Sequence, residues 1–232
     1  MLECKNLSIW YTNEKKIMDH VDFSVDDHRV IGLLGINGAG KTTLINTISG
    51  IHTKYEADSI LVNQQESDFM DHNFRLSRYT VFTDEQAFQY WTFPEYKSYI
   101  EKVYKKRIEN EYLNYLLDGF KFGEYQKQFI KNLSTGNKKK VFLITGFAMQ
   151  LPLLILDEPL DGLDFNSSEF LYEVLRQHKK YGSVLMSSHI AESFERTCDK
   201  VLLLKQGKIS AKYVSDHMDI RRELKGWLDD GK

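Results

Sequence analysis

The sequence lacks any segment that could carry the chain through a membrane. No run approaches the ~20 consecutive apolar residues that a helix needs to cross a bilayer. The first five residues, from Met1 to Lys5, lack the apolar block of a secretory signal. We therefore expect a cytoplasmic protein. If it works at a membrane, another polypeptide must do the spanning.

Cysteine, proline and excess charge are also scarce. The two cysteines, Cys4 and Cys198, lie far apart and form no C-x-x-C pair, so neither a disulfide framework nor a zinc site is indicated. The three prolines accompany no low-complexity linker, and no internal repeat is present. A formal net charge of −2 gives no overall pull toward nucleic acid, and we expect no nucleic-acid partner.

What the sequence does contain is enough apolar residues for a sizeable core. Hydrophobic residues make up 42% of the 232, the profile of an ordinary globular protein. Residues 21–25 alternate apolar and polar side chains, as a half-buried strand does. Four other short runs are apolar throughout and suit strands buried on both faces: residues 30–34, 153–156, 184–186 and 201–204.

Helical segments lie between these runs. Residues 166–169 (Asn-Ser-Ser-Glu) form a capping arrangement that predicts a helix to about residue 180, and residues 190–198 predict another. The stretch at about 94–131 is rich in Tyr, Lys, Glu and Leu, contains no strand-like run, and predicts an inserted helical subdomain. Strands that alternate with helices indicate an α/β domain around a largely parallel sheet.

Residues 35–42, Gly-Ile-Asn-Gly-Ala-Gly-Lys-Thr, match the phosphate-binding motif G-x-x-x-x-G-K-[ST] in full. Glycines let the backbone turn tightly and aim N–H groups at phosphate oxygens, and the following helix N-terminus adds partial positive charge. Lys41 supplies a mobile charge for the β- and γ-phosphates, and the Thr42 hydroxyl can ligate Mg²⁺. The alternative is a glycine-rich turn that happens to precede Lys-Thr. The place between a buried strand and a helix favours nucleotide binding.

A second candidate site follows the apolar run 153–156, which ends in Asp157 and Glu158. At the carboxyl end of a parallel strand, both side chains can reach a ligand above the sheet. Asp157 is placed to hold the Mg²⁺ shell, and Glu158 is the candidate base that orients and deprotonates an attacking water. A lone Asp-Glu pair is by default a solvated acidic turn. The phosphate-binding loop makes the catalytic interpretation the stronger one.

Four further segments, each weak alone, fall in the order found in one family. Residues 133–137 (LSTGN) resemble the signature LSGGQ, residues 160–164 (LDGLD) the D-loop, and residues 187–189 (SSH) the switch-histidine segment. Residues 7–11 (LSIWY) resemble the segment whose aromatic ring stacks on adenine. Together with the two sites above, this ordered set makes the chain similar to the nucleotide-binding domains of ABC transporters, from residue 1 to about 209.

The resemblance implies an α/β fold: a P-loop NTPase core with a largely parallel sheet, an N-terminal antiparallel β portion and an inserted helical subdomain. It implies a single ABC ATPase domain over residues 1–232. The helical subdomain would lie at about 86–137, and a short C-terminal tail at about 210–232.

The resemblance also implies a site for ATP and Mg²⁺ that two copies of the domain share. Thr42 and Asp157 would hold the metal, and Glu158 and His189 would act in hydrolysis, His189 as a neutral hydrogen-bonding contact to the γ-phosphate and the attacking water. Ser134 and Gly136 would contact ATP held by the partner's phosphate loop. The ATP contacts within one chain would be Tyr11 (with Trp10 as the less favoured choice), Gly35, Asn37, Gly38, Ala39, Gly40, Lys41, Thr42 and Thr43.

Outside that context, several of these residues have ordinary structural explanations. A Trp-Tyr pair usually lies in the core, Leu-Ser-Thr-Gly is a common helix cap, and a lone histidine is more often structural than functional. The basic run 138–140 is expected to be a solvated helix face. Seven aromatic residues are expected mainly in the core, with an exposed docking groove as the alternative: Phe82, Phe88, Tyr90, Trp91, Phe93, Tyr96 and Tyr99.

Some positions depart from the family pattern. In the signature, Thr135 and Asn137 replace the usual Gly and Gln, so we expect a working but weakened composite site. Either Thr83 or Gln86 could take the place of the Q-loop glutamine. Asp161 adds a charge to the D-loop, where a small residue is common. These departures leave room for an asymmetric heterodimer.

The family resemblance implies an ATP-hydrolysing subunit that sits peripherally on the inner face of the cell membrane. Its partners would be an integral membrane permease subunit and a second ABC ATPase subunit. The segments 37–40 and 188–192 look most like those of drug, antibiotic and peptide exporters of the ABC-2 type. Two alternatives remain open: a soluble ABC ATPase in translation or DNA maintenance, and a nucleotide-gated binding module with weak hydrolysis.

Overall fold

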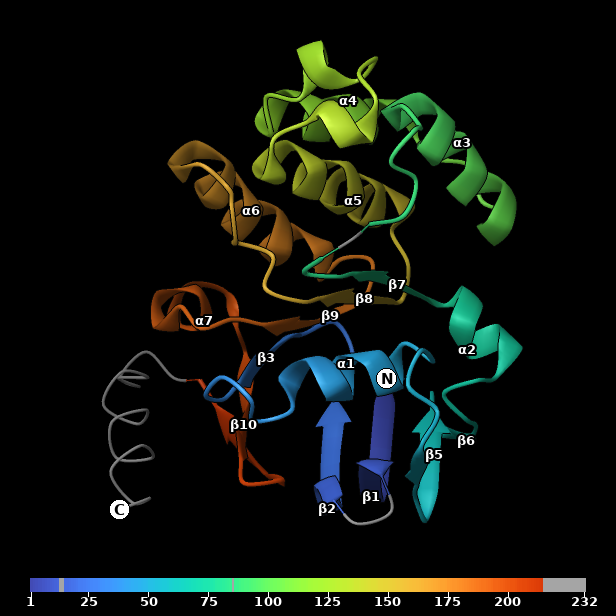
Figure 1. Cartoon of the computed structure of the whole chain (residues 1–232), viewed down its shortest axis with the longest axis vertical. Helices are drawn as coiled ribbons and strands as arrows, with labels where there is room; N and C mark the ends of the chain where they lie inside the picture. Colours follow the sequence, from blue (N-terminus) through green and yellow to red (C-terminus); the bar gives the residue numbers. More distant parts are fainter. Residues whose placement is uncertain (13–14, 85, 215–232) are drawn as a thin grey trace.

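A six-stranded sheet forms the centre of the molecule, as the computed structural model shows for residues 1–12, 15–84 and 86–214 (Figure 1). Its strand order is β11-β10-β3-β9-β8-β7. The five strands from β10 to β7 pair in parallel, and only β11 runs antiparallel, along β10. The prediction of an α/β fold with a largely parallel sheet is therefore confirmed. The strands are β3 (Val30–Leu34), β7 (Arg78–Val81), β8 (Leu153–Leu156), β9 (Ser183–Ser187), β10 (Lys200–Lys205) and β11 (Lys208–Tyr213).

The predicted apolar runs coincide with the central strands because those strands are covered on both faces. Every residue of β3, β8 and β9 is buried. A strand in that position presents no side to water, so an unbroken apolar run is its natural sequence. β9 and β10 extend each predicted run by one residue at both ends.

A smaller antiparallel sheet lies on the side of the chain's first helix, α1 (Lys41–Ile48), that faces away from the large sheet. Its order is β2-β1-β5-β6, with β4 paired to β1. The apolar side of α1, including Leu44 and Ile48, packs in one core with residues of both sheets. This core fixes the helix that follows the phosphate-binding loop. The strands are β1 (Leu2–Thr12), β2 (Lys15–Val25), β4 (Tyr55–Glu56), β5 (Ser59–Val62) and β6 (Gln65–Glu66).

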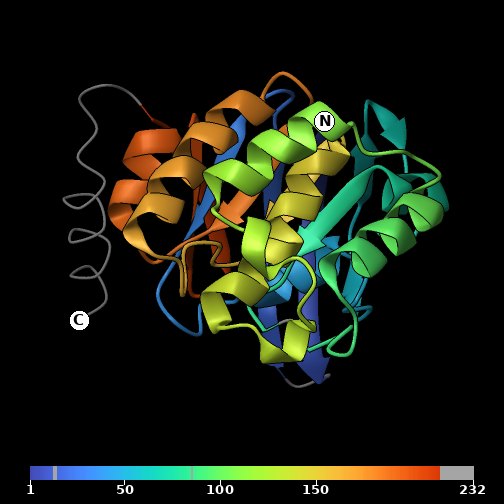
Figure 2. The same cartoon turned by 90° about the horizontal axis from the view of Figure 1, so that it is seen from above.

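Helices cover the opposite face of the large sheet, and from above they spread across the strands (Figure 2). α5 is buried along its whole length after Lys138, so it lies in the middle of this layer. None of the helices in the described ranges is long and apolar enough to cross a membrane. The helices are α2 (His72–Leu76), α3 (Phe93–Tyr104), α4 (Asn110–Gly119), η1 (Gly123–Tyr125), η2 (Ile130–Asn132), α5 (Thr135–Met149), α6 (Phe165–His178) and α7 (Ala191–Thr197).

Two predicted boundaries differ from the structure. The cap of α6 is Asp164, whose Oδ1 accepts a hydrogen bond from the Ser167 N–H at 2.9 Å, and this cap lies two residues before the predicted Asn166 cap. Residues 210–213 belong to β11 and pair with β10, although the predicted tail begins at residue 210. Residues 215–232 of that tail lie outside the described residues.

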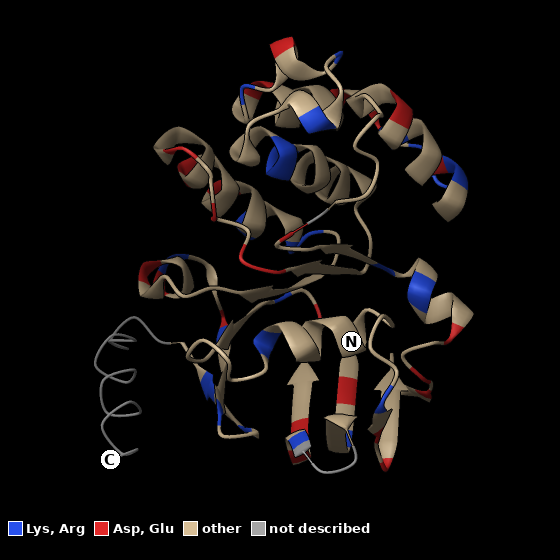
Figure 3. Cartoon of the chain, in the orientation of Figure 1, with Lys and Arg blue, Asp and Glu red and all other residues tan. Residues whose placement is uncertain are grey.

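The basic run 138–140, part of the blue segment of α5 in Figure 3, is not a solvated face. Lys139 and Lys140 are each only 5% exposed, so the prediction is wrong for both. Lys140 pairs with Asp164 at 3.1 Å, and Lys139 reaches three backbone carbonyls. Because α5 is buried on all sides, its sequence has no separate apolar and polar faces from which the burial of these lysines could be predicted.

Most of the seven aromatic residues pack into the helical layer, as expected. Phe93 and Tyr96 are buried in the core, and Phe88 and Trp91 lie partly buried against it. Tyr90 and Tyr99 are the exceptions, with 70% and 40% of their surfaces exposed. These packed rings join α3 to the segment that leaves β7.

Candidate functional site: a nucleotide pocket at the ends of β3 and β8

The phosphate-binding loop connects β3 to α1 and depends on two glycines for its path. Gly40 has a φ of 105° and forms the N-cap of α1, a conformation that L side chains rarely adopt. A Cβ at Gly35 would come within 2.7 Å of the Leu204 carbonyl oxygen on β10. No acidic residue occupies the first turn of α1. The helix N-terminus therefore presents free N–H groups and partial positive charge, which suit an anionic ligand.

Lys41 places its ammonium group at the centre of this loop. Its Nζ donates to the carbonyl oxygens of Gly35 at 2.8 Å and Ile36 at 3.4 Å. The same Nζ lies 4.0 Å from Oε1 of Glu158 on the far side of the pocket. The side chain is buried, so its charge is poorly screened by water. A triphosphate entering the loop would meet this charge directly.

Asp157 is held at the end of β8 by two hydroxyl groups. Thr42 Oγ1 donates to Asp157 Oδ2 at 3.1 Å, and Ser187 Oγ donates to Asp157 Oδ1 at 2.6 Å. The carboxylate is 1% exposed, so both of its oxygens depend on these partners. Thr42 and Asp157, the two predicted metal ligands, are therefore in direct contact.

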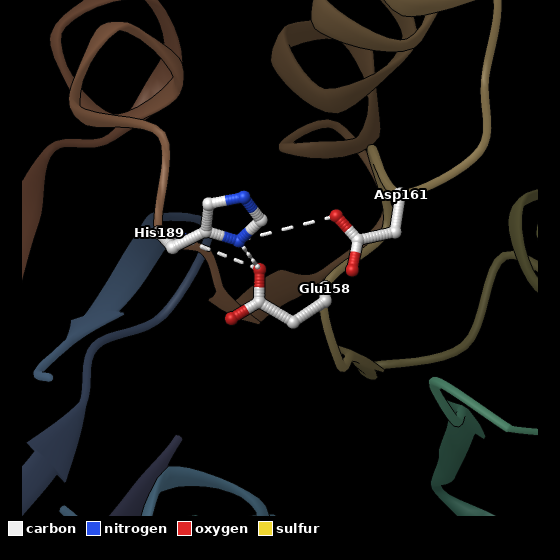
Figure 4. Close-up of side chains that lie close together, drawn as sticks. All are labelled: Glu158, Asp161 and His189. Atoms are coloured by element: carbon white, nitrogen blue, oxygen red, sulfur yellow. Dashed lines mark hydrogen bonds and ion pairs between the residues drawn. The ribbon is translucent and has the colours of Figure 1, made fainter. Parts of the chain in front are cut away.

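Glu158 lies next to Asp157 in a left-handed backbone conformation, with a φ of 46°. Its Oε2 accepts a hydrogen bond from the His189 N–H at 3.1 Å and lies 2.9 Å from His189 Nδ1 (Figure 4). Asp161 Oδ1 is 3.9 Å from the same ring nitrogen. The predicted catalytic pair, Glu158 and His189, is thus in contact, and the charge of Asp161 lies beside it.

The pocket next to the phosphate-binding loop has a volume of about 860 Å³. Tyr11 and Thr43 line one side of it, and Asp157 and Glu158 line the other. The Tyr11 hydroxyl lies 3.2 Å from Thr43 Oγ1, and the ring is half exposed toward the pocket. Trp10 is not among the residues that line it. The geometry therefore supports Tyr11 over Trp10 as the ring that would stack on a base.

Both candidates for the Q-loop position line the same pocket. Thr83 Oγ1 donates to the Asp157 carbonyl oxygen at 3.2 Å, which fixes the end of β7 to the end of β8. Gln86 is exposed, and its Oε1 accepts a hydrogen bond from Gln89 at 2.8 Å. Thr83 is anchored to the residue that follows the acidic strand, whereas the hydrogen bond of Gln86 to a described residue stays within its own loop.

Ser134 and Gly136 lie at the N-terminus of α5, apart from the residues that line the pocket. Ser134 is the N-cap, and its Oγ accepts a hydrogen bond from the Asn137 N–H at 3.2 Å. A Cβ at Gly136 would come within 2.2 Å of the Gly162 carbonyl oxygen. The signature segment and the D-loop therefore touch backbone to backbone within one chain.

Two residues of the site were missed by the sequence reasoning. Ser187 donates to Asp157 and also accepts a hydrogen bond from the Glu158 N–H at 2.9 Å. Its signal was a serine at the end of an apolar run, directly before the switch-histidine segment. Lys139 reaches the Glu158 carbonyl at 3.3 Å, and a lysine within a basic run gave no signal of that contact.

A comparison with protein-family models finds one match, described as ABC transporter, over residues 18–161. Among curated proteins, the chain is 33% identical over 97% of its length to the putative ABC transporter ATP-binding protein AlbC of Bacillus subtilis (strain 168), and it covers 96% of that protein. It is 28% identical over 90% of its length to the SkfA peptide export ATP-binding protein SkfE of the same organism, and covers 87% of it.

Solved structures agree with these relatives. A structure described as the ATP binding subunit of an ABC transporter matches this chain with a TM-score of 0.84 and 29% sequence identity. The match covers 99% of this chain and 97% of the other.

Proposed function

This chain belongs to the ATP-binding subunits of ABC transporters, and on that premise we propose that it binds and hydrolyses ATP to power export through a separate membrane-spanning subunit. One observation carries the proposal. The phosphate-binding loop, Asp157 and Glu158 line one pocket that is large enough for a nucleotide, and His189 contacts Glu158 beside it. Phosphate recognition, metal binding and a base are thus assembled in one place.

Thr42 at the start of α1 and Asp157 at the end of β8 fit a magnesium ion. Thr42 and Asp157 offer a hydroxyl and a carboxylate, the hard oxygen ligands that Mg²⁺ prefers. Their oxygens lie 3.1 Å apart, close to the ~2.9 Å between neighbouring ligands of an octahedral ion with bonds of 2.0–2.1 Å. Mg²⁺ bound there would neutralise charge on the β- and γ-phosphates. Ser187 keeps the carboxylate oriented toward the loop.

We assign the hydrolytic step to Glu158. Its carboxylate accepts a proton from water as the water oxygen bonds to the γ-phosphorus and the bond to the β,γ-bridging oxygen breaks. Lys41 and the loop N–H groups stabilise the phosphate charge during this step. His189, already within hydrogen-bond distance of Glu158, is placed to orient the water and the γ-phosphate.

A second subunit would complete the site. Ser134 and Gly136 lie away from the pocket of their own chain, so their groups are available to a γ-phosphate held by another copy. ATP would then hold two subunits together, and hydrolysis would remove the shared contacts. We propose that the closed pair acts on a permease at the inner face of the membrane. The relative SkfE, described as a peptide export protein, supports export as the direction.

Glu158→Gln tests the catalytic assignment. The amide cannot accept the proton, so turnover should fall at least ~100-fold, while ATP affinity is retained. With Mg²⁺ and ATP this variant should elute as a stable dimer in size-exclusion chromatography with light scattering. Lys41→Ala is the control for binding, because it removes the ammonium group that pairs with the phosphates. This variant should lose both ATP binding and dimer formation. Wild-type turnover in Glu158→Gln would exclude Glu158 as the base.

Transport through a membrane subunit needs its own test. The full chain should copurify in mild detergent with an integral membrane protein, and that complex should hydrolyse ATP faster than the chain alone. Copurification with ribosomes or DNA instead would contradict the proposed transport role.

A further inference from the structure

Lys139 is a buried cation in the middle of the site. Its side chain extends from the first turns of α5 and is 5% exposed. The ammonium group donates to three backbone carbonyl oxygens, those of Thr83 at 3.2 Å, Glu158 at 3.3 Å and Phe82 at 3.4 Å. Among the described residues, no carboxylate oxygen lies within 4.0 Å of it. Burial lowers the pKa of Lys139, and the more distant Asp161 and Asp157 oppose that shift.

The three carbonyls belong to two loops that meet above the sheet. Phe82 and Thr83 begin the segment that leads from β7 to α3, and Glu158 follows β8. The Thr83 hydroxyl also donates to the Asp157 carbonyl oxygen at 3.2 Å. One lysine therefore joins the entrance of the helical layer, the acidic strand and α5, the helix capped by Ser134.

The Glu158 backbone needs such support. A φ of 46° is uncommon for a residue other than glycine and persists only where the surrounding contacts hold it. Ser187 binds the N–H of Glu158 at 2.9 Å. On the other side, the Glu158 carbonyl accepts from Lys139 and from the Asp161 N–H at 3.2 Å. Lys139 is thus the side-chain donor, among the described residues, that holds the carbonyl of this residue.

We propose that Lys139 is a positioning residue for ATP hydrolysis, which holds the Glu158 carboxylate in place through the Glu158 carbonyl and ties that placement to the position of α5. The inference rests on the proposed role of Glu158 as the base. It gives the signature helix a direct connection to the base of its own chain. Movement of α5 then alters the geometry of Glu158 as well as the position of Ser134.

Lys139→Met tests this role, because methionine matches much of the side chain's volume and removes the three donated hydrogen bonds. Steady-state phosphate release by the purified full chain should show a kcat at least tenfold lower, with the KM for ATP within twofold of wild type. Lys139→Arg retains a charged donor and should recover part of the lost kcat. The matched control is Lys138→Met, one residue earlier on α5, which should keep kcat and KM within twofold.

Each outcome separates this inference from the proposed function. If Glu158→Gln abolishes turnover but Lys139→Met leaves kcat within twofold, Lys139 does not position the base. An equal loss in Lys138→Met, or a KM that rises as far as kcat falls, also overturns the role. Thermal unfolding of each variant is measured alongside. If Lys139→Met is unfolded at the assay temperature, Lys139→Gln, whose uncharged side chain ends one bond short of the ammonium position, is assayed by the same criteria.

Discussion

Replacing Ser187 with alanine should separate the acidic end of β8 from its support. Ser187 is fully buried at the end of β9. Its hydroxyl donates to Asp157 Oδ1 at 2.6 Å and accepts from the Glu158 N–H at 2.9 Å. Alanine keeps the strand conformation and removes both contacts. The change therefore acts on two neighbouring residues of the site without touching the phosphate-binding loop.

The expected loss of stability follows from what is left unpaired. A hydrogen bond to a charged group contributes about 1.5–3 kcal/mol, and a buried N–H without a partner costs about 1–3 kcal/mol. Asp157 retains its contact with Thr42, so we expect about 3 kcal/mol in total rather than the sum of the upper values. The matched control is Ser183→Ala at the other end of β9, which removes one bond to the Asp26 carbonyl at 2.8 Å. That change should cost about 1 kcal/mol.

Urea denaturation of the two variants without nucleotide measures this difference, and ATP turnover measures its effect on the site. Ser187→Ala should lose at least tenfold in kcat, because the left-handed backbone of Glu158 loses one of its supports, while Ser183→Ala should keep wild-type turnover. Equal stability of the two variants, to within about 0.5 kcal/mol, would show that Ser187 does not hold the pair. Wild-type turnover in Ser187→Ala would refute its link to Glu158.

Two further predictions concern stability and packing. Burial lowers the pKa of His178 to about 4 from an ordinary 6.5, and the nearby Leu151 backbone opposes only part of this shift. Between these pH values His178 is protonated in the unfolded chain but not in the folded chain. The free energy of unfolding should therefore fall by about 2–3 kcal/mol from pH 7 to pH 4.5 because of this residue. Urea titrations of His178→Phe should show a fall in unfolding free energy that is smaller by this amount. An unchanged pH dependence would contradict the assignment. Gly136→Ala would bring a Cβ 2.2 Å from the Gly162 carbonyl oxygen, while Gly123→Ala enters open space. The first should cost about 1–3 kcal/mol and most of the ATPase activity, the second little of either; equal behaviour of the two variants would rule out the close contact.

The parts of the molecule that could be predicted from sequence are those with local causes. The run at residues 30–34 is apolar because β3 is covered on both faces, so its bounds matched the structure. The phosphate-binding loop needs glycine where its backbone takes a positive φ, because residues with a Cβ rarely adopt that conformation, and Gly40 is an example. The start of α6 was misplaced because Asp164 and Asn166 are both good caps. Only the contact with the Ser167 N–H distinguishes them.

The parts that could not be predicted depend on contacts between distant segments. Lys139 meets carbonyls 19 and 56 residues away, and nothing in its neighbouring sequence records them. Ser187 supports Asp157 across two adjacent strands, a pairing set by sheet order. The same holds for Gly136: it was expected to contact ATP held by a partner, but its close approach to Gly162 appears only in the folded chain.

That approach brings the backbone at the start of α5 into direct contact with the turn at Gly162, so a displacement of either is passed to the other. In a head-to-tail pair, the α5 side of this contact would reach the neighbour's nucleotide, and the Gly162 side would stay beside Glu158 and Asp161 of its own chain. Loss of the neighbour's γ-phosphate would then be passed through this contact to Glu158.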